Sequence, residues 1–429
     1  MRQSVDVAIV GGGPAGSVLA MLLAREGVRV LVVDRAAFPR PKPCGDCLSA
    51  AAAGILERLG LLHSIEMQGP AHLEGWRIVA ADGASFSARF SRMDGAEPHA
   101  DIALAISRDR LDNVLLEAAR AAGAIVHTRA TVTDVIAGPE PWVAVRTARG
   151  SLDLRARIVV GADGLRSVVA RRTRSIRRPP RTRKLSLTAH VQAVVLPDTL
   201  GEMHLADGFC VGLAPVGQEA FNLTLVADAD RFGREAAAHP EGFLRASLHR
   251  FPLLPTRLQN ASLAGRALLE RMEGGDAGSR RGSRILASGP FDFPTRRIVG
   301  PGFALVGDAA GYFDPFTGQG ICHALHGAEL LSSAILDVLA FPAGAHRRLE
   351  AYARAHRRSF GPTRLLQGVI DDVLRHPRLA ARAIRRLAAA PRAASALLAA
   401  TADVRPPASL LSPPVLLSFA LPVSWRPAP

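Results

Sequence analysis

The sequence predicts an α/β protein that combines a parallel sheet, an antiparallel sheet and a set of C-terminal helices. Three observations support this prediction. Residues 5–34 read as strand, glycine-rich turn, helix and strand, whereas residues 185–226 contain short strand patterns separated by turns. Residues 344–400 are rich in Ala, Leu and Arg and have a helical pattern. The 429 residues are 48% hydrophobic, which is enough to form a large core.

The first βαβ pattern carries a dinucleotide-binding signature. Gly11, Gly13 and Gly16 follow the G-x-G-x-x-G spacing between the first strand and a helix that begins near Pro14. The free N–H groups at the start of such a helix can bind a pyrophosphate. Asp34 ends the second strand, where a carboxylate can bind ribose hydroxyls. The pattern therefore predicts a Rossmann-type nucleotide site; the alternative is a glycine-rich turn in a buried sheet with no ligand.

The middle of the chain alternates between extended and helical patterns. The three prolines of residues 39–43 predict an extended segment, and a helix is expected at 50–62. A hairpin is predicted around Asp82-Gly83, and a helix from Ser107. Further strands are expected at 125–129, 132–136, 142–147 and 158–160, and helical pieces at 241–250 and 255–260.

Two more glycine-rich elements follow buried strands. One is Gly161–Ser167, and the other is Gly307–Gly320, which leads into a predicted helix over residues 321–339. Residues 274–282 read as a flexible linker between them. The helical pattern after residue 344 is predicted to break at Gly361-Pro362, Pro377 and Pro391, and the tail from residue 406 is apolar and Pro-rich.

Composition narrows the classes of function. The net charge of +15 comes almost entirely from arginine and predicts a basic surface. Aromatic residues are only 5%, and no nucleic-acid-binding motif accompanies the charge, so no nucleic-acid partner is expected. No apolar stretch reaches the roughly 18 residues of a spanning helix, which predicts a cytoplasmic protein. The arginines and the apolar tail leave weak contact with a membrane surface open; the oligomeric state is not predicted.

The four cysteines do not indicate a disulfide scaffold or a metal site. Cys44 and Cys47 have C-x-x-C spacing, but no second pair completes a zinc site. No metal is therefore predicted. A redox-active pair remains one alternative, and packing near a cofactor is the other.

The three glycine-rich elements, in this order and with strand-rich segments between them, resemble the FAD-dependent aromatic hydroxylase superfamily, the group A flavoprotein monooxygenases. That superfamily also contains flavin halogenases and geranylgeranyl reductases. The resemblance covers about residues 5–339, and the segment Pro41–Ser49 looks most like the geranylgeranyl-reductase branch. It implies a Rossmann-type FAD-binding domain with three-layer ββα topology, an α+β substrate domain with an antiparallel sheet, and C-terminal helices.

The resemblance also implies a division of the chain. Residues 1–75, 100–182 and 284–343 would form the discontinuous FAD-binding domain, and residues 76–99 and 183–283 the substrate domain. Residues 344–429 would form C-terminal helices and a Pro-rich tail that cap the fold or cover the substrate pocket.

Site residues are carried over where this sequence matches the superfamily's motifs. Asp163-Gly164 and Gly307-Asp308 match its D-G and G-D motifs, and the loop Asp314–Gly320 would lie beside the isoalloxazine ring. The implied FAD-binding residues are Gly11, Gly13, Ala15, Gly16, Asp34, Arg35, Cys44, Gly45, Arg108, Asp163, Gly164, Gly307, Asp308, Gly318, Gln319 and Gly320. Pro315, Gly318 and Gly320 would support catalysis at the ring, because a helix beginning at Gly320 can stabilise the reduced flavin anion. His190 and His204 are candidate bases on strands, or simply histidines of the core or surface.

The expected function is that of an FAD-dependent oxidoreductase whose transient electron donor is NAD(P)H. The first prediction is a monooxygenase that hydroxylates a small aromatic or polyketide-like hydrophobic substrate through a flavin C4a-hydroperoxide. The alternative is a reductase that saturates isoprenoid double bonds. A halogenase is disfavoured because no W-x-W-x-I-P stretch is present and no lysine lies between Lys42 and Lys184. A flavoprotein scaffold without activity is the non-enzyme alternative.

Overall fold

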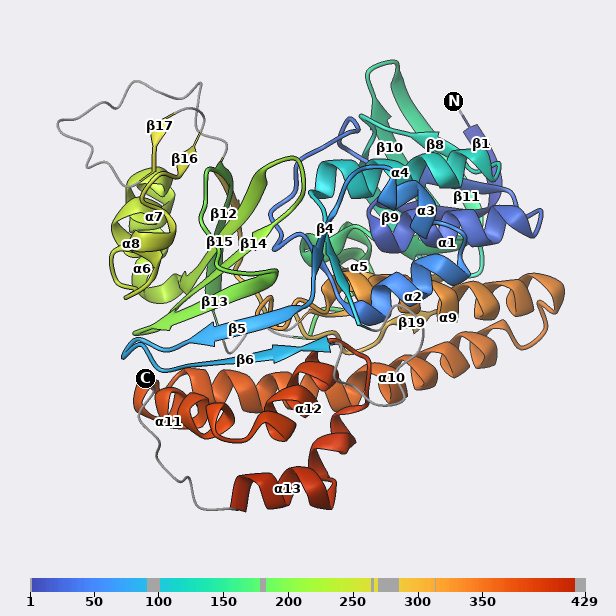
Figure 1. The fold of residues 1–429 in the computed structure, drawn as a ribbon. Coiled ribbons are helices and arrows are strands. Elements are labelled where there is room, and N and C mark those ends of the chain that lie inside the picture. The colour runs from blue at the N-terminus through green and yellow to red at the C-terminus, as the bar shows by residue number, and fades with distance from the viewer. Residues whose placement is uncertain are drawn as a thin grey trace.

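The structure is a computed structural model that describes residues 2–90, 101–177, 183–263, 266–268, 285–312 and 314–420. Two large sheets lie beside each other, and the C-terminal helices form a layer along one side of the molecule (Figure 1). The linker expected at residues 274–282 lies outside the described residues.

The first sheet confirms the predicted α/β unit. Its strand order is β19-β20-β11-β1-β2-β8, and β10 and β9 extend it from β11 as an antiparallel meander. The strands are β1 (Arg2–Val10), β2 (Val30–Val33), β8 (Ile125–His127), β9 (Thr131–Ile136), β10 (Trp142–Thr147), β11 (Gly150–Gly161), β19 (Val299–Gly300) and β20 (Phe303–Leu305). β1 pairs in parallel with β2 and β11, and β20 pairs in parallel with β11. The carboxyl ends of these strands therefore meet at one edge, where the glycine-rich turns follow.

Helices cover this sheet because its strands are apolar on both faces. All four residues of β2 are buried, as expected for a central parallel strand. Three long helices provide the cover, α1 (Pro14–Arg25), α4 (Arg108–Ala121) and α9 (Gly320–Ala340), and α1 packs against both of the others. The helix α1 begins with Pro14, whose fixed φ and missing N–H suit the first helical position.

The second sheet is the expected antiparallel one. Its order is β17-β16-β12-β15-β14-β13-β5-β6, with β18 pairing to β12. The strands are β5 (Gly75–Val79), β6 (Ser85–Arg89), β12 (Lys184–Gln192), β13 (Leu200–Ala206), β14 (Phe209–Pro215), β15 (Ala220–Asp228), β16 (Ser262–Leu263), β17 (Arg266–Ala267) and β18 (Leu286–Ser288). The early hairpin β5–β6 joins it through a parallel pairing of β5 with β13. Segments more than a hundred residues apart thus share one sheet.

Short helices and a small sheet complete these layers. α6 (Ala229–Ala238), α7 (Pro240–Leu248) and α8 (Leu254–Arg257) pack with the second sheet in a separate hydrophobic cluster. Of these, α6 was not expected from the sequence. β3 (Cys47–Leu48), β7 (Ala103–Ala105) and β4 (Ala71–Leu73) form a three-stranded sheet, and α2 (Ala50–Arg58), α3 (Leu62–Glu66), η2 (Gly164–Arg166), α5 (Val168–Arg172) and η3 (Gly307–Ala310) are short helices.

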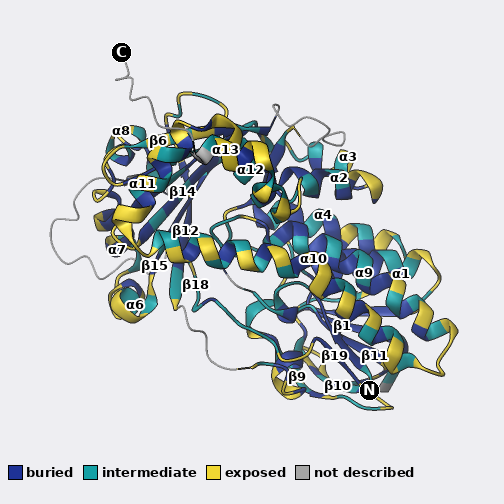
Figure 2. Ribbon diagram, turned by 90° about the horizontal axis from the view of Figure 1, so that it is seen from below, coloured by how far each residue is buried: buried dark blue, intermediate teal, exposed yellow. Residues whose placement is uncertain are grey.

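The C-terminal segment is helical, as predicted, but one predicted break is wrong. α10 (Ala345–Leu374) runs through Pro362 as a single helix, followed by α11 (Pro377–Ala388), α12 (Pro391–Thr401), η4 (Pro407–Leu411) and α13 (Pro413–Ala420). Buried Phe360, Thr363 and Gln367 hold α10 in place around the proline, so packing outweighs one missing hydrogen bond. Seen from below, α10–α13 lie across the near side with exposed and buried stripes (Figure 2). Within the described residues, no helix has both the length and the apolar character to span a membrane.

Candidate active site

One cavity of about 560 Å³ joins the two sheets and the C-terminal helices. All three glycine-rich elements contribute to its lining, as does the segment around Cys44. Strands β12, β13, β14 and β15 of the second sheet form one wall, and α10, α11 and α12 form another. The motifs that lie far apart in the sequence are therefore brought to a single space.

The first glycine-rich turn is tight because its glycines leave no room for side chains. A Cβ on Gly16 would lie 1.9 Å from the carbonyl oxygen of Gly11, and Gly11 itself has a φ of +106°. Gly13 and Ala15 line the cavity. Because no side chain caps the start of α1 and its first turn holds no acid, its free N–H groups can receive an anion.

Asp34 connects this turn to the end of β2. Its Oδ2 accepts a hydrogen bond from the Gly12 N–H at 2.8 Å, and its Oδ1 accepts one from Ala36 at 2.8 Å. The carboxylate is thus held beside the turn, but Asp34 does not line the cavity, so ribose binding by this acid stays a prediction. Arg35 is exposed and does not line the cavity.

Positive charge gathers at the glycine-rich end of the cavity. Arg108 is buried at the start of α4, and its Nε and Nη2 donate to the two carboxylate oxygens of Asp112 at 2.8 and 2.9 Å. Burial alone would lower the pKa of Arg108, but this ion pair outweighs it and the guanidinium stays charged. Arg40 also pairs with Asp112 at 3.1 Å, and Lys42 lines the cavity nearby. Burial is the main cause of a lowered pKa for Lys42, and repulsion from Arg108 lowers that pKa further.

The second glycine-rich element holds a buried carboxylate with spare bonding capacity. Asp163 Oδ2 accepts a hydrogen bond from Val168 at 2.6 Å, while its buried Oδ1 has no partner within the described residues. Burial raises the pKa of this carboxyl group. Gly164, which adopts a φ of +75°, lines the cavity together with Ala162 and Leu165.

The third element forms the floor of the cavity next to α9. Gly307 and Asp308 line it, as do Pro315, Gly318 and Gly320. Gly318 has a φ of +69°, a conformation that favours glycine. α9 starts at Gly320 without a side-chain cap and without an acid in its first turn, so its dipole can act on a bound group.

Gln319 was expected to bind the cofactor, but its side chain lies elsewhere. It is buried, and its Nε2 donates to Asp403 Oδ1 at 2.6 Å. Gln367 of α10 donates to Gln319 Oε1 at 3.1 Å and to Thr317 Oγ1 at 2.9 Å. Gln319 therefore ties the loop to the C-terminal helices, and it is absent from the cavity lining.

The segment Pro43–Cys47 crosses the cavity against the second sheet. Cys44, Gly45 and Cys47 all line it, and burial raises the pKa of both thiols. Asn222 of β15 holds this segment, because its Nδ2 donates to the Cys44 carbonyl and to Asp46 Oδ2, each at 2.8 Å.

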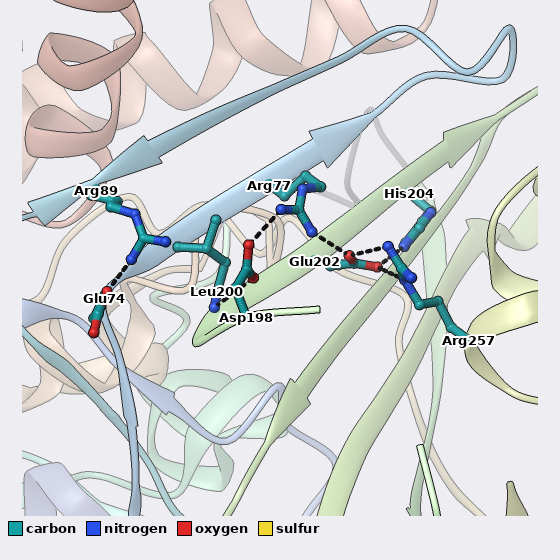
Figure 3. A network of polar contacts seen from close by, with 8 residues as sticks. All are labelled: Glu74, Arg77, Arg89, Asp198, Leu200, Glu202, His204 and Arg257. Atoms are coloured by element: carbon teal, nitrogen blue, oxygen red, sulfur yellow. Dashed lines mark hydrogen bonds and ion pairs between the residues drawn. The ribbon is translucent and has the colours of Figure 1, made fainter. Parts of the chain in front are cut away.

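Neither histidine predicted as a base lines the cavity. His190 lies 2.6 Å from Asp46 Oδ2 through its Nε2, and this hydrogen bond raises its pKa. His204 is fully buried on the face of β13 opposite to Met203 and Leu205, which do line the cavity. There its Nε2 lies 2.9 Å from Glu202, next to Arg77 and Arg257 (Figure 3). The structure thus does not bring either imidazole to the cavity.

Several residues that line the cavity belong to none of the motifs recognised in the sequence. Lys42 lines the cavity, and Arg40 binds Asp112 without lining it. Both lie in the Pro-rich segment after the second strand, a position that could have indicated a role beside the nucleotide site. Tyr312, Trp76 and the apolar residues of α10–α12 line the cavity without any motif. They can be found only once the fold brings distant segments together.

The residues present fit FAD. The tight glycine turn and the uncapped helix start suit a pyrophosphate, and Arg108 and Lys42 add positive charge. Asp308 lines the cavity and offers an acceptor for hydroxyl groups, whereas Asp163 does not line it. No group of three or more potential metal ligands occurs within the described residues.

Comparison with known proteins agrees with this fit. The chain is 30% identical over 362 residues to the menaquinone reductase of Mycolicibacterium smegmatis. The matched region covers 78% of this chain and 78% of that protein. It is 24% identical over 376 residues to the tryptophan 2-halogenase of Chondromyces crocatus, covering 84% of this chain and 66% of that protein, just under two thirds of its length.

Solved structures show the same fold. The FAD-dependent chondrochloren halogenase CndH matches with a TM-score of 0.74 and 26% identity, covering 86% of this chain and 82% of its own. A geranylgeranyl bacteriochlorophyll reductase-like protein from Thermoplasma acidophilum matches with a TM-score of 0.73 at 20% identity, covering 90% and 92% of the two chains. At 20% identity, the similarity to the Thermoplasma protein shows a shared fold and nothing more.

A family model described as an FAD binding domain matches residues 4–237, more than half of the chain. With the glycine-rich turns around one cavity, the match confirms the predicted superfamily, Rossmann-type fold and FAD. The chain belongs to this family of FAD-binding flavoproteins, and it is an FAD-dependent oxidoreductase.

Proposed function

We propose that this enzyme is a reductase that saturates a carbon–carbon double bond in the isoprenoid part of a hydrophobic substrate, with NAD(P)H as the electron donor. The observation that carries the proposal is the cavity itself. It extends without a break from the proposed FAD-binding residues to the apolar walls formed by β13, β14 and α10–α12. A long apolar chain can therefore lie next to the flavin loop.

The distribution of charge in the cavity supports an apolar substrate. Lys42, Arg108 and Asp308 are the only charged residues among the described residues that line it, and all belong to the cofactor end. Beyond them the walls carry side chains such as Ile78, Leu205 and Leu397. Burying apolar surface there favours binding by roughly 25 cal/mol per Å².

Saturation of a double bond adds a hydride and a proton. Bound and reduced FAD supplies the hydride, and the protein must orient the alkene and supply the proton. The Cys44 thiol and the Tyr312 hydroxyl both line the cavity, and burial raises the pKa of each, so both stay protonated at neutral pH. We propose these two as candidate proton donors, with Pro315, Gly318 and Gly320 shaping the loop beside the ring.

A flavin monooxygenase is the second candidate. Aromatic side chains such as Trp76, Phe86, Phe90 and Phe291 line the cavity and could pack on an aromatic ring. No histidine lines the cavity within the described residues, so a phenol would lack an imidazole base there. This is why we place hydroxylation second, after reduction.

The deciding experiment compares products from the purified, FAD-loaded enzyme. Under anaerobic conditions with NAD(P)H, the prenyl side chain of a short-chain polyprenyl quinone should gain two hydrogens. Mass spectrometry with fragmentation locates them, after the ring has been reoxidised to the quinone, because reduction of the ring to the hydroquinone also adds two hydrogens. Strictly oxygen-dependent gain of one oxygen by a phenolic substrate, with no reduction of prenyl chains, would replace the proposal with the monooxygenase. A halogenated product formed only when halide and oxygen are present would replace it with halogenation.

A further inference from the structure

The C-terminal helices carry an unusual share of the exposed apolar side chains. Of the eleven large hydrophobic residues that are exposed in the described part of the chain, six lie between residues 365 and 417. They are Leu365, Val369, Leu379, Leu411, Leu416 and Leu417. They lie on α10, α11, η4 and α13, which form one side of the molecule (Figures 1 and 2). We refer to these six residues as the C-terminal apolar patch.

Positive charge accompanies this patch. Residues 365–417, which span the patch, contain seven arginines and three acidic residues, Asp371, Asp372 and Asp403, of which Asp371 is buried. On α11, Ala380, Ile384 and Leu387 point inward and are buried, whereas Arg378 and Arg382 are exposed on the outer side. α11 is therefore an amphipathic helix with a basic outer face.

The cavity reaches the surface at the same place. Val369 lines the cavity, yet it is 61% exposed to solvent. Leu410 also lines the cavity, and its neighbour Leu411 is 71% exposed. An apolar path thus connects the apolar patch with the space beside the flavin loop.

We propose that the outer side of α10–α13 docks onto the surface of an anionic lipid bilayer. The leucines of the patch enter the interface between headgroups and acyl chains, and the arginines bind the anionic headgroups. A second copy of this chain is a poorer occupant, because it would bring two arginine-rich faces together. The docking rests on the surface itself. Its purpose, which is to let a lipid-soluble substrate pass from the bilayer into the cavity, rests on the proposed function.

Vesicle flotation of the FAD-loaded full chain tests the docking without any assay of activity. The protein should float with vesicles of phosphatidylcholine mixed with phosphatidylglycerol. It should bind at least about tenfold less to phosphatidylcholine alone, and added salt should weaken its binding. Failure of the wild-type protein to bind anionic vesicles would overturn the proposal.

Paired variants locate the surface. Replacing Leu411, Leu416 and Leu417 with serine should lower vesicle binding by at least about tenfold, since each leucine loses its apolar contact with lipid. The matched control replaces Ile125 of β8, Ile136 of β9 and Val195 of the β12–β13 loop with serine. These residues are also exposed but lie away from α10–α13, so this variant should bind as the wild type does. Equal loss of binding in both triple variants would contradict a localised docking face.

Charge is tested in the same way. Arg378→Gln with Arg382→Gln should weaken binding by about tenfold or more, whereas Arg146→Gln with Arg149→Gln, at the exposed β10–β11 hairpin, should not. A dimer in solution that is lost in the leucine variant, with no vesicle binding, would assign the patch to a second copy instead. If docking fails while a short-chain substrate is still reduced, the docking is wrong and the proposed function stands.

Discussion

Lys184 Nζ lies 2.5 Å from Asp314 Oδ2 and joins strand β12 of the antiparallel sheet to the loop that leads into α9. The same ammonium lies 2.5 Å from Asp371 Oδ1 of α10, and Arg375 also binds that carboxylate, at 2.7 Å. Both carboxylates are almost completely buried. Burial lowers the pKa of Lys184, but the two acids outweigh it and raise the pKa overall. One lysine therefore fixes the first residue of the flavin loop against two other elements.

Replacing Lys184 with methionine should destabilise the protein by roughly 3 kcal/mol or more, because two buried carboxylates lose their shared cation. The free energy of unfolding in urea measures this loss. FAD affinity should fall as well, since Asp314 begins the loop at the cavity. The neighbouring Arg183→Gln is the matched control: its ion pair with Asp230 is exposed on both sides and should be worth at most about 1 kcal/mol. Equal effects of the two substitutions would contradict a central role for Lys184.

Gly16→Ala should deplete bound FAD, because the new Cβ would lie 1.9 Å from the Gly11 carbonyl oxygen and would force the turn open. The absorbance of bound flavin in the purified protein measures the loss. Gly54→Ala is the opposite case, since Gly54 lies within α2 with no atom within 4 Å of the added Cβ. That substitution should stabilise the protein by about 0.5–1 kcal/mol and leave FAD content unchanged. Full FAD content in Gly16→Ala would refute the tight-turn interpretation.

The elements with strong local signals could be predicted from the sequence. The βαβ unit around Gly11–Gly16, the helix after Gly320 and the hairpin at Asp82-Gly83 each depend on glycine turns and apolar periodicity within a few residues. The structure confirms these elements as α1, α9 and β5–β6. The positions of α1 and α9 then follow from the topology of the parallel sheet, whereas β5–β6 belongs to the antiparallel sheet.

Features that depend on partners far along the chain could not be predicted. Whether His204 faces the cavity or the core depends on the register of β13 with β5, and nothing local to residue 204 sets it. Gln319 lies in a glycine-rich motif, yet its side chain binds Asp403, 84 residues away. The helix through Pro362 persists because of tertiary packing, which outweighs the local preference of proline.

Gly212→Leu should block the substrate and spare the cofactor. Gly212 lies on β14 in the cavity wall, and nothing lies within 4 Å of a Cβ placed there, so a leucine would project into the open space. FAD content and thermal stability should stay close to the wild-type values, while turnover of a prenyl substrate should fall by at least about tenfold, as expected when a bulky side chain fills the substrate space. Unchanged turnover with normal FAD content would place the substrate elsewhere.

Glu202 is fully buried at the centre of an ion cluster on the antiparallel sheet, and the side chains of its partners Arg77 and Arg257 are each 19% exposed (Figure 3). Its Oε1 accepts a hydrogen bond from Arg77 at 2.8 Å, its Oε2 accepts one from Arg257 at 3.2 Å, and His204 lies 2.9 Å away. Burial would raise the pKa of this carboxyl group, but its three partners outweigh burial and lower the pKa to about 2. The cluster joins β5, β13 and α8.

Because the pKa of Glu202 is depressed in the folded state, its contribution to stability is present above about pH 4.5 and is lost as the pH falls toward 2. The shift corresponds to on the order of 3 kcal/mol. Glu202→Gln should therefore lower the free energy of unfolding by about that amount at pH 7, and the gap to the wild type should narrow below pH 4.5. Thermal and urea unfolding across this range measure it. Glu74→Gln, which removes the half-exposed partner of Arg89, should cost at most about 1 kcal/mol and serves as the control. A gap that does not change with pH would show that the charge of Glu202 is not what stabilises the cluster.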